Sequence, residues 1–331
     1  MLVGMFDWLR LSRASGLFTV TANIVTAVTV AVYVGGTDPR HLVRQVALPE
    51  AVWVLCCGGL LLLSGMIWND WADVERDRSL HPRRPLASGR IAPFAAWLAA
   101  LLLSSSALLI AALLGPRGVY AAGLVLFLAL LYNFLTKQIA YIGSLTMGAV
   151  RAALALFALL ALHPDFFDRA WAALLTTGPG VAGDLWCYPL LLAAYVTGVT
   201  LLSELESRRG RRCELLLAGG LVIAVLVLVL LRLLSAPWLH DPLRPPGTMT
   251  LVALGLFLAV GGWTLWRFVR PWWTCVRSAR RDDVGPAVAA GLGGMILCDG
   301  LIAARAHPIL GLAVLALFGP YLLASAMVRM D

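Results

Sequence analysis

The stretch N-D-W-A-D-V-E-R-D-R-S-L-H-P-R-R-P-L-A-S-G at residues 69–89 decides the fold, because it places acids and arginines directly after an apolar segment. That segment, residues 51–68, contains no charged residue and is long enough to cross a bilayer. If the helix continues through residues 69–77, Asp70, Asp73 and Asp77 lie at i, i+3 and i+7 on one face. The stretch therefore predicts a membrane helix that ends in a carboxylate cluster.

Carboxylates that share one helix face repel one another unless a cation lies among them. Carboxylate and amide oxygens suit Mg²⁺, which usually shares its coordination shell with phosphate and water. The basic residues that follow could complete a diphosphate site; they are Arg76, Arg78, Arg83 and Arg84. The alternative is a solvated loop between two membrane helices, with arginines that only set the topology. Both interpretations stay open on these residues alone.

The composition predicts an all-α, polytopic membrane protein. Of the 331 residues, 60% are hydrophobic and only 13% are charged, about half the charge of a soluble domain. We expect one domain over residues 1–331, with motif loops at 69–90 and 203–214. The expected spans are 17–34, 51–68, 91–114, 119–135, 139–162, 185–202, 215–234, 249–268, 284–304 and 309–328, with an interfacial helix around 168–176.

The net charge of +8 does not indicate a nucleic-acid partner, because the arginines fall between the apolar segments. Most basic residues lie on one side if the N-terminus is inside. The positive-inside rule then places both motif loops and both termini in the cytoplasm, as in a bacterial-type inner membrane. The six cysteines show no disulfide or metal spacing, and no cleavable signal peptide is apparent.

The pattern N-D-x-x-D-x-x-x-D followed by R-P-L-x-S-G resembles the first aspartate-rich motif of the UbiA superfamily of intramembrane prenyltransferases. The match covers Asn69, Asp70, Asp73, Asp77, Arg84, Pro85, Leu86, Ser88 and Gly89. The resemblance implies that the Asn and the three Asp residues hold Mg²⁺ against a prenyl diphosphate, with Arg83 and Arg84 beside it. It also implies a helical bundle around a central cavity. Nine spans is the usual count in the superfamily, so we expect nine to ten transmembrane helices.

The superfamily's second aspartate-rich motif is altered here to T-L-L-S-E-L-E-S-R-R-G-R-R, residues 200–212. Glutamates stand where aspartates are expected, and the D-x-x-x-D spacing is absent. By position, Ser203, Glu204, Glu206 and Arg208 become substrate-binding candidates, and Glu206 a metal candidate. The alternative is a surface pair between Glu204 and Arg208 at i, i+4, worth about 0.2–0.5 kcal/mol.

Lys137, the single lysine of the chain, follows Tyr132 in the string Y-N-F-L-T-K. This resembles the superfamily's Y-x-x-x-x-K, whose lysine reaches toward the diphosphate, and makes both residues site candidates. A lysine that extends to the membrane interface is the alternative.

Three polar residues are expected inside spans, where they generally face a cavity or a partner: Asn23, Arg151 and Asp299. Arg151 could bind phosphate or the acceptor, or pair with Asp299. It closes the string G-x-x-x-M-G-x-x-R at residues 143–151, which, with S-x-x-E at Ser203 and Glu206, resembles the EboC-type branch of the superfamily.

The sequence thus predicts Mg²⁺-dependent transfer of a prenyl group from an isoprenyl diphosphate to a lipophilic acceptor in the bilayer. The expected catalytic residues are Asp70, Asp73, Lys137 and Arg151. The altered second motif motivates a rival, a non-catalytic isoprenoid-binding, lipid-binding or transport component on the same scaffold. A third interpretation is an unrelated secondary transporter, although no inverted repeat is evident.

Overall fold

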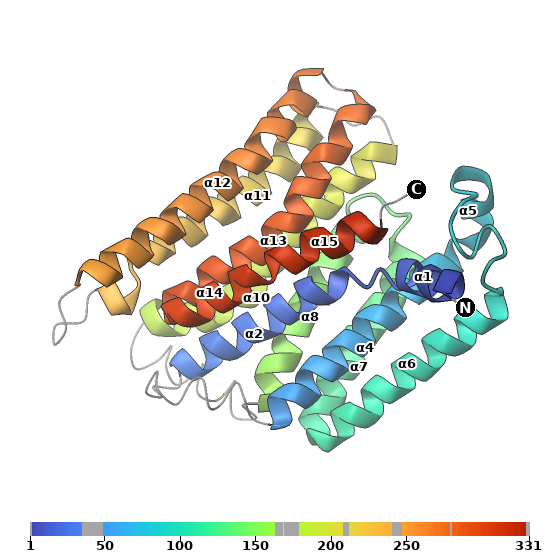
Figure 1. Cartoon of the computed structure of the whole chain (residues 1–331), viewed down its shortest axis with the longest axis horizontal. Helices are drawn as coiled ribbons and strands as arrows, with labels where there is room; N and C mark the ends of the chain where they lie inside the picture. The colour runs from blue at the N-terminus through green and yellow to red at the C-terminus, as the bar shows by residue number, and fades with distance from the viewer. Residues whose placement is uncertain are drawn as a thin grey trace.

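A computed structural model describes residues 2–34, 49–162, 168, 179–207, 212–239, 247–278 and 280–328 (Figure 1), and this part of the chain folds into helices without strands. The helices are α1 Leu2–Leu11, α2 Gly16–Val34, α4 Pro49–Ala72, α5 Val74–Leu80, α6 Pro93–Leu113, α7 Pro116–Leu131, α8 Ile142–Leu162, α10 Pro179–Ser207, α11 Arg212–Leu234, α12 Thr248–Ser278, α13 Val284–Ala306, α14 Pro308–Ala316 and α15 Phe318–Val328. A π-helical turn, Tyr132–Thr136, extends α7, and short 3₁₀ turns lie at Pro237–Leu239 and Arg281–Asp283.

The predicted spans match the helices. Within the described residues, nine helices are long and apolar enough to cross a membrane, and α1 with α2 forms a tenth candidate bent by 46°. The eighth span was predicted too short, because α12 continues through charged residues to Ser278. The last span is divided at Leu317 between α14 and α15. Of the expected interfacial helix at 168–176, only Asp168 lies within the described residues.

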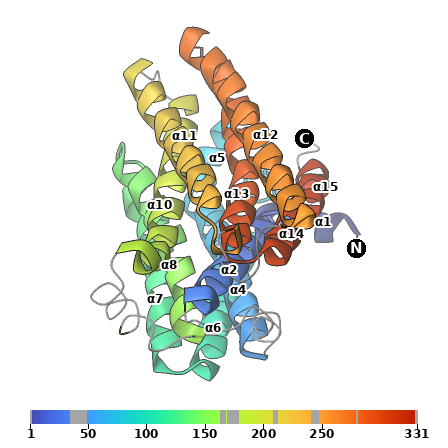
Figure 2. The same cartoon turned by 90° about the vertical axis from the view of Figure 1, so that its left-hand side faces the viewer.

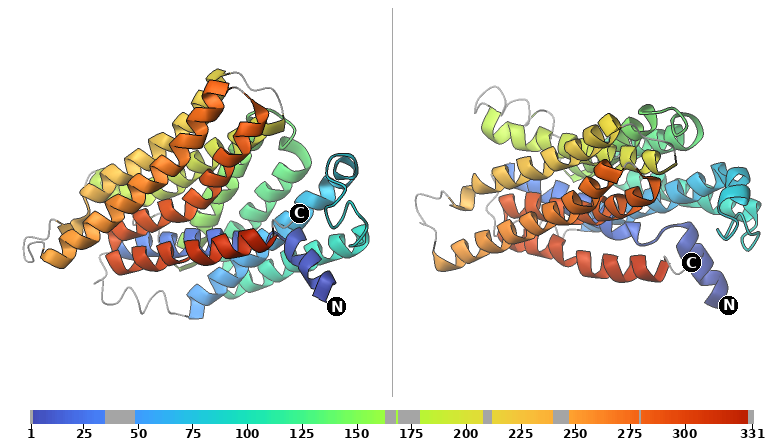
Figure 3. Two further views of the ribbon diagram at one scale, coloured as in Figure 1. Left: turned by 45° about the horizontal axis from the view of Figure 1, so that its top comes forward. Right: turned by 90° about the horizontal axis from the view of Figure 1, so that it is seen from above.

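Helices α2, α8, α10 and α13 form the centre of the bundle, and α13 packs against the other helices of the C-terminal half and against α2. Figure 1 shows α4, α6 and α7 on one side of this centre and α11 and α12 on the other. The side view in Figure 2 shows α11 and α12 running side by side. Both views in Figure 3 place α5 at one end of the bundle and the start of α12 at the opposite end.

Glycines permit the close helix contacts, which matters because helices in lipid associate through packing rather than through a hydrophobic driving force. A Cβ at Gly148 of α8 would lie 2.6 Å from the Ala193 carbonyl oxygen of α10. A Cβ at Gly294 of α13 would lie 2.5 Å from the Tyr195 hydroxyl. These contacts hold α8, α10 and α13 close enough to enclose the polar residues described below.

Candidate functional site

The acidic motif lies where α4 bends into α5. Helical hydrogen bonds continue across the junction, from the Asp73 amide to the Asn69 carbonyl (3.1 Å) and from the Asp77 amide to the Asp73 carbonyl (2.8 Å). Asp73 itself has φ −92° and ψ 1°, outside regular α-helix geometry, and separates the two helices. The expected helix over residues 69–77 therefore forms with a bend at Asp73.

The bend sends the three aspartates to three different cations. Asp70 Oδ1 lies 3.4 Å from Arg13 Nη2, and Asp77 Oδ2 lies 2.7 Å from Arg84 Nη1. Asp73 pairs with Lys137. The three carboxylates therefore do not converge on one cation, and in the described part of the chain no three acidic, His or Cys side chains lie together as a metal site. The metal roles predicted for the three aspartates stay predictions.

Two oxygens of the motif nevertheless converge on a single position. The ammonium of Lys137 donates to Asn69 Oδ1 at 2.7 Å and also to Asp73 Oδ2. A position that binds an ammonium through an amide oxygen and a carboxylate has the hard donors that Mg²⁺ requires. Mg²⁺ is commonly bound through one or two carboxylates, with substrate phosphates completing the shell. Asn69 and Asp73 thus fit a metal that is shared with a diphosphate.

A pocket of about 310 Å³ surrounds this position, and we call it the mouth pocket. Its basic side chains are Arg13, Arg76, Arg84 and Lys137; its acids are Asp73, Asp77 and Glu204; Asn69, His81, Tyr132, Thr200 and Ser203 complete the lining. The first and second motifs, more than a hundred residues apart in the sequence, therefore meet at one pocket.

Three predicted site residues of the first motif lie outside the mouth pocket. Asp70 is buried, and its partner Arg13 lines the pocket in its place. Arg78 pairs with Glu75 at 2.7 Å on the exposed face of α5. Arg83 is exposed, and its carbonyl accepts a hydrogen bond from Arg90 Nη2 at 2.6 Å. These three positions can support the pocket but do not form its wall.

In the second motif, Glu204 is positioned by the beginning of α8. Its carboxylate accepts hydrogen bonds from the Ser144 hydroxyl and from the Tyr141 amide, the latter at 3.5 Å. Tyr141 has φ +66°, an unusual left-handed conformation. The Glu206 side chain and Arg208 lie outside the described residues, so the predicted roles of both stay predictions.

Sequence reasoning missed Arg13, Tyr141 and Ser144. Arg13 carried a usable signal, since it immediately precedes the first span on the side where the motifs lie. Tyr141 and Ser144 carried none, because a tyrosine at an interface and a serine in a membrane helix are both common.

An apolar chamber of about 120 Å³ continues inward from the mouth pocket, between α2, α4, α7 and α8. The two spaces share Arg13, Asn69 and Tyr132. The chamber is otherwise lined by Val20, Gly58, Leu61, Leu62, Gly65, Met66, Val125, Ala129, Asn133, Met147, Val150, Arg151 and Leu154. Tyr132 and Asn133 belong to the π-helical turn, and Asn133 Nδ2 donates to the Gly65 carbonyl at 3.0 Å. A polar entrance therefore opens onto a mostly hydrocarbon-lined interior.

The three intramembrane polar residues come together beside the chamber. Arg151 Nη1 donates to Asn23 Oδ1 at 3.1 Å, and Asn23 Nδ2 donates to Asp299 Oδ2 at 2.6 Å. The Tyr188 hydroxyl lies 3.1 Å from Asp299 Oδ1 and 2.9 Å from the Asn23 carbonyl. The predicted pairing of Arg151 with Asp299 is thus bridged by the Asn23 amide. Arg151 lines the chamber, whereas Asn23 and Asp299 are buried behind it.

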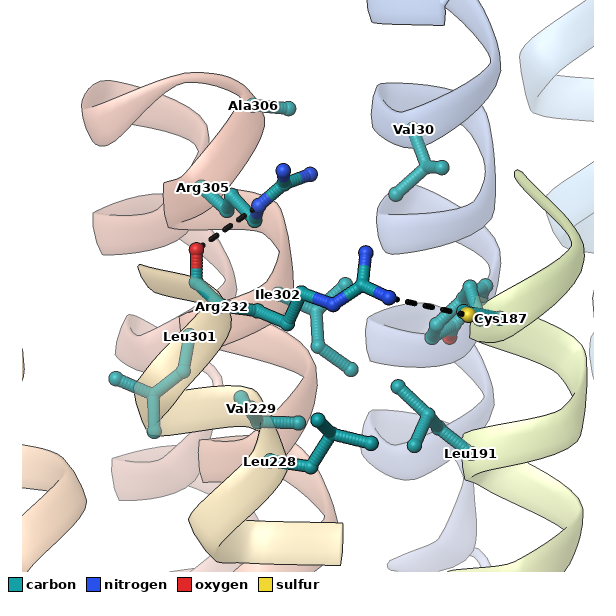
Figure 4. Close-up of a pocket in the computed structure, with 11 residues that line it drawn as sticks. Val30, Cys187, Leu191, Leu228, Val229, Arg232, Leu301, Ile302, Arg305 and Ala306 are labelled. Carbon is teal, nitrogen blue, oxygen red and sulfur yellow. Dashed lines mark hydrogen bonds between the residues drawn. The ribbon is translucent and has the colours of Figure 1, made fainter. Parts of the chain in front are cut away.

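Another pocket lies at the opposite end of the bundle (Figure 4). There Arg232 Nη2 lies 3.7 Å from Cys187 Sγ, and Arg305 Nε donates to the Arg232 carbonyl at 2.9 Å. Its volume of about 40 Å³ has room for only a few water molecules. It shares no lining residue with the mouth pocket or the chamber. We therefore assign the candidate site to the mouth pocket and the chamber.

The described residues thus form a bundle of apolar helices in which a charged, polar entrance opens onto an apolar interior. Residues 24–281 match the family model described as "UbiA prenyltransferase family". The chain therefore belongs to the UbiA prenyltransferase family, and with nine apolar helices among its described residues it is an integral membrane protein.

Curated relatives share part of the chain. The polyprenyl transferase trt2 of Aspergillus terreus is 32% identical over 130 residues, which cover 39% of this chain and 37% of the relative. The polyprenyl transferase ausN of Aspergillus calidoustus is 33% identical over 137 residues, 40% of this chain and 36% of the relative. The similarity thus spans well under half the length of either relative.

Solved structures share the fold over nearly the whole chain. A structure reported for digeranylgeranylglyceryl phosphate synthase superposes with a TM-score of 0.55 at 15% identity, covering 92% of this chain and 98% of that one. A UbiA homologue from Aeropyrum pernix K1 gives a TM-score of 0.54 at 18% identity, covering 86% and 96%. At these identities the likeness establishes the arrangement of the helices.

Proposed function

We propose that this protein is a Mg²⁺-dependent prenyltransferase that moves a prenyl group from an isoprenyl diphosphate to a lipophilic acceptor within the membrane. The observation that carries the proposal is the continuity of the mouth pocket with the chamber through Arg13, Asn69 and Tyr132. A prenyl diphosphate has the complementary form, an anionic head on a hydrocarbon tail.

The diphosphate is held by the basic residues of the mouth pocket. Arg13 and Arg84 are each oriented by a buried aspartate, Asp70 and Asp77, which fixes guanidinium groups suited to bidentate phosphate contacts. This gives Asp70 a positioning role, although it does not itself line the pocket. Lys137 adds a third charge from the end of the π-helical turn.

Asn69 and Asp73 would hold Mg²⁺, with Asp77 in the same pocket as a further oxygen donor. When bound, the metal supplies charge neutralisation for the diphosphate as it leaves. The ammonium of Lys137, which now occupies the position between Asn69 and Asp73, is then available to the diphosphate oxygens.

The chamber protects the allylic cation that remains after the diphosphate departs. Its aliphatic side chains exclude water, which would otherwise quench the cation before the acceptor attacks. The mouth pocket then lies at the cytoplasmic surface, because the positive-inside rule places its end of the bundle inside. The same rule supports cytoplasmic termini. We further propose a bacterial-type inner membrane, and one domain for the whole chain because the described helices pack into a single bundle.

The test is the release of diphosphate from geranyl diphosphate by the purified protein in vesicles made from a native lipid extract, with and without Mg²⁺. Asp73→Asn should lower the rate on the order of 100-fold, as expected for the loss of a group that stabilises developing charge. Glu75→Gln is the matched control, because Glu75 lies on the exposed face of α5 and pairs with Arg78.

Equal rates for the wild type and Asp73→Asn would overturn the metal assignment. Binding of geranyl diphosphate without any release would favour the rival, a non-catalytic isoprenoid-binding component. The observation that motivates this rival is the substitution of Glu204 for an expected aspartate in the mouth pocket.

A further inference from the structure

The chamber is short, and a charge lies in its inner half. Its α4 wall runs from Asn69 to Gly58, which is about 16 Å of helix. On α8 it runs from Met147 to Leu154, and Arg151 lies one turn inward of Met147. The volume of about 120 Å³ is close to the roughly 150 Å³ of a cavity that holds one benzene ring of six carbons. The space suits roughly one five-carbon isoprene unit, with a second reaching toward the mouth pocket.

Arg151 is fixed in this position by residues from other helices. Its guanidinium donates to Asn23 Oδ1 at 3.1 Å and to Thr19 Oγ1 at 3.4 Å, both on α2. Asn23 is fully buried and is itself held by Asp299 of α13 and Tyr188 of α10. Swinging the guanidinium aside would break this network and separate Arg151 from the carboxylate that balances its charge.

A hydrocarbon chain that extended past this point would have to cover a charged group. The hydrogen bonds of Arg151 to Asn23 and Thr19 use two of its five N–H donors. Covering the others with aliphatic carbon would bury polar hydrogens without partners, which is unfavourable in a membrane interior. Arg151 thus opposes a long chain both by occupying space and by electrostatics.

We propose that Arg151 is a specificity-determining residue that closes the inner part of the chamber and restricts the donor to short prenyl diphosphates, of about one or two isoprene units. The inference rests on the proposed function, since it concerns the donor of that reaction. It assigns Arg151 to the prenyl end of the substrate rather than to the diphosphate, because Arg151 lines the chamber and not the mouth pocket.

The experiment compares dimethylallyl, geranyl, farnesyl and geranylgeranyl diphosphates in Mg²⁺, with Kd measured by tryptophan fluorescence and diphosphate release measured in parallel. The wild type should bind geranyl diphosphate at least tenfold more tightly than geranylgeranyl diphosphate. Arg151→Met combined with Asp299→Asn, which leaves no unpaired charge, should shift that ratio about tenfold toward the longer chain. Arg117→Met, on the exposed first turn of α7, is the control and should leave the ratio unchanged.

A second variant narrows the chamber instead. Among the described residues outside its own stretch of helix, only the Ala129 Cβ, at 3.9 Å, lies within 4 Å of a Cβ added to Gly65. Gly65→Leu therefore extends into the space. In this variant the affinity for geranyl diphosphate should fall about tenfold relative to the affinity for dimethylallyl diphosphate. A merely structural role for Arg151 predicts that the ratio of geranyl to geranylgeranyl diphosphate affinities stays constant in the folded Arg151→Met, Asp299→Asn variant.

Equal wild-type affinities for geranyl and geranylgeranyl diphosphates would overturn the inference, as would an unchanged ratio in the folded double variant. If the double variant does not fold, the wild-type series and Gly65→Leu still decide whether the chamber limits the length of the prenyl chain. A protein that binds donors with the expected chain preference but releases no diphosphate would contradict the proposed function while supporting this inference.

Discussion

The charges of Arg151 and Asp299 should be energetically coupled through Asn23, and a double-mutant cycle can measure the coupling. Arg151→Met leaves Asp299, which is 1% exposed, without its balancing cation. Asp299→Asn leaves the guanidinium without its anion. Breaking a buried pair by removing one partner costs about 3–5 kcal/mol, and the intervening amide places these single changes near the lower value of about 3.

The double variant should cost less than the sum of the two single changes. It contains no isolated charge. The oxygen of an asparagine at position 299 can accept from Asn23 Nδ2 while its amide nitrogen donates to the Tyr188 hydroxyl, whose proton can go to the Asn23 carbonyl. The double variant should therefore fall short of additivity by about 2–3 kcal/mol.

Unfolding of the protein in mixed detergent micelles, followed by circular dichroism, supplies the four free energies. Thr26→Val is the control, because Thr26 Oγ1 lies 3.2 Å from the Asp299 carbonyl oxygen and does not contact the carboxylate. Combined with Arg151→Met, it should be additive. If the free-energy changes of Arg151→Met and Asp299→Asn also add to within about 0.5 kcal/mol, the two charges are not coupled through Asn23 and the reasoning is refuted.

Two further predictions concern the C-terminal half. Gly219→Ala should destabilise the protein because its Cβ would overlap the Trp272 indole. Gly220→Ala should be neutral or stabilising by up to about 1 kcal/mol, because its Cβ would meet none of the described atoms outside its own stretch of helix within 4 Å. Thermal unfolding of both variants checks this, and equal shifts would contradict it. Burial lowers the pKa of His307, so the unfolded chain binds more protons and stability should fall as the pH drops below about 6.5. His307→Asn should flatten that dependence in unfolding measured between pH 5 and 8, and an unchanged slope would contradict it.

The spans and the proximity of Asn69 to Asp73 could be predicted from the sequence because each depends on short-range order. Bilayer thickness sets the length of an apolar helix, and the spacing of Asn69 and Asp73 brings both within one helical turn. The cost of burying a charge in lipid also singled out Arg151 and Asp299 individually.

Which residues meet could not be predicted in the same way, because the partners come from distant helices. Asn23 is 276 positions from Asp299 and 128 from Arg151. The pairing of Arg13 with Asp70 across 57 positions likewise depends on how α2 packs beside α4. The bend at Asp73 has no sequence signal, since neither Pro nor Gly occurs in residues 69–77.

The charges of the mouth pocket supply a last prediction, which separates metal binding from structure at Asp73. Four basic side chains there face three carboxylates, so the charge of the pocket is nearly balanced and it should bind a diphosphate weakly without a divalent ion.

In EDTA, Asp73→Asn removes a negative charge and frees Lys137 from its carboxylate partner, so the variant should bind geranyl diphosphate at least as tightly as the wild type. In Mg²⁺ the order should reverse, because the variant has lost a metal-binding carboxylate. Titration by tryptophan fluorescence under both conditions checks this, and Glu75→Gln should behave as the wild type in each. If the variant binds geranyl diphosphate more weakly than the wild type in both conditions, Asp73 maintains the shape of the pocket and does not bind the metal. Only the loss of a metal ligand would raise the affinity without the ion and lower it with the ion.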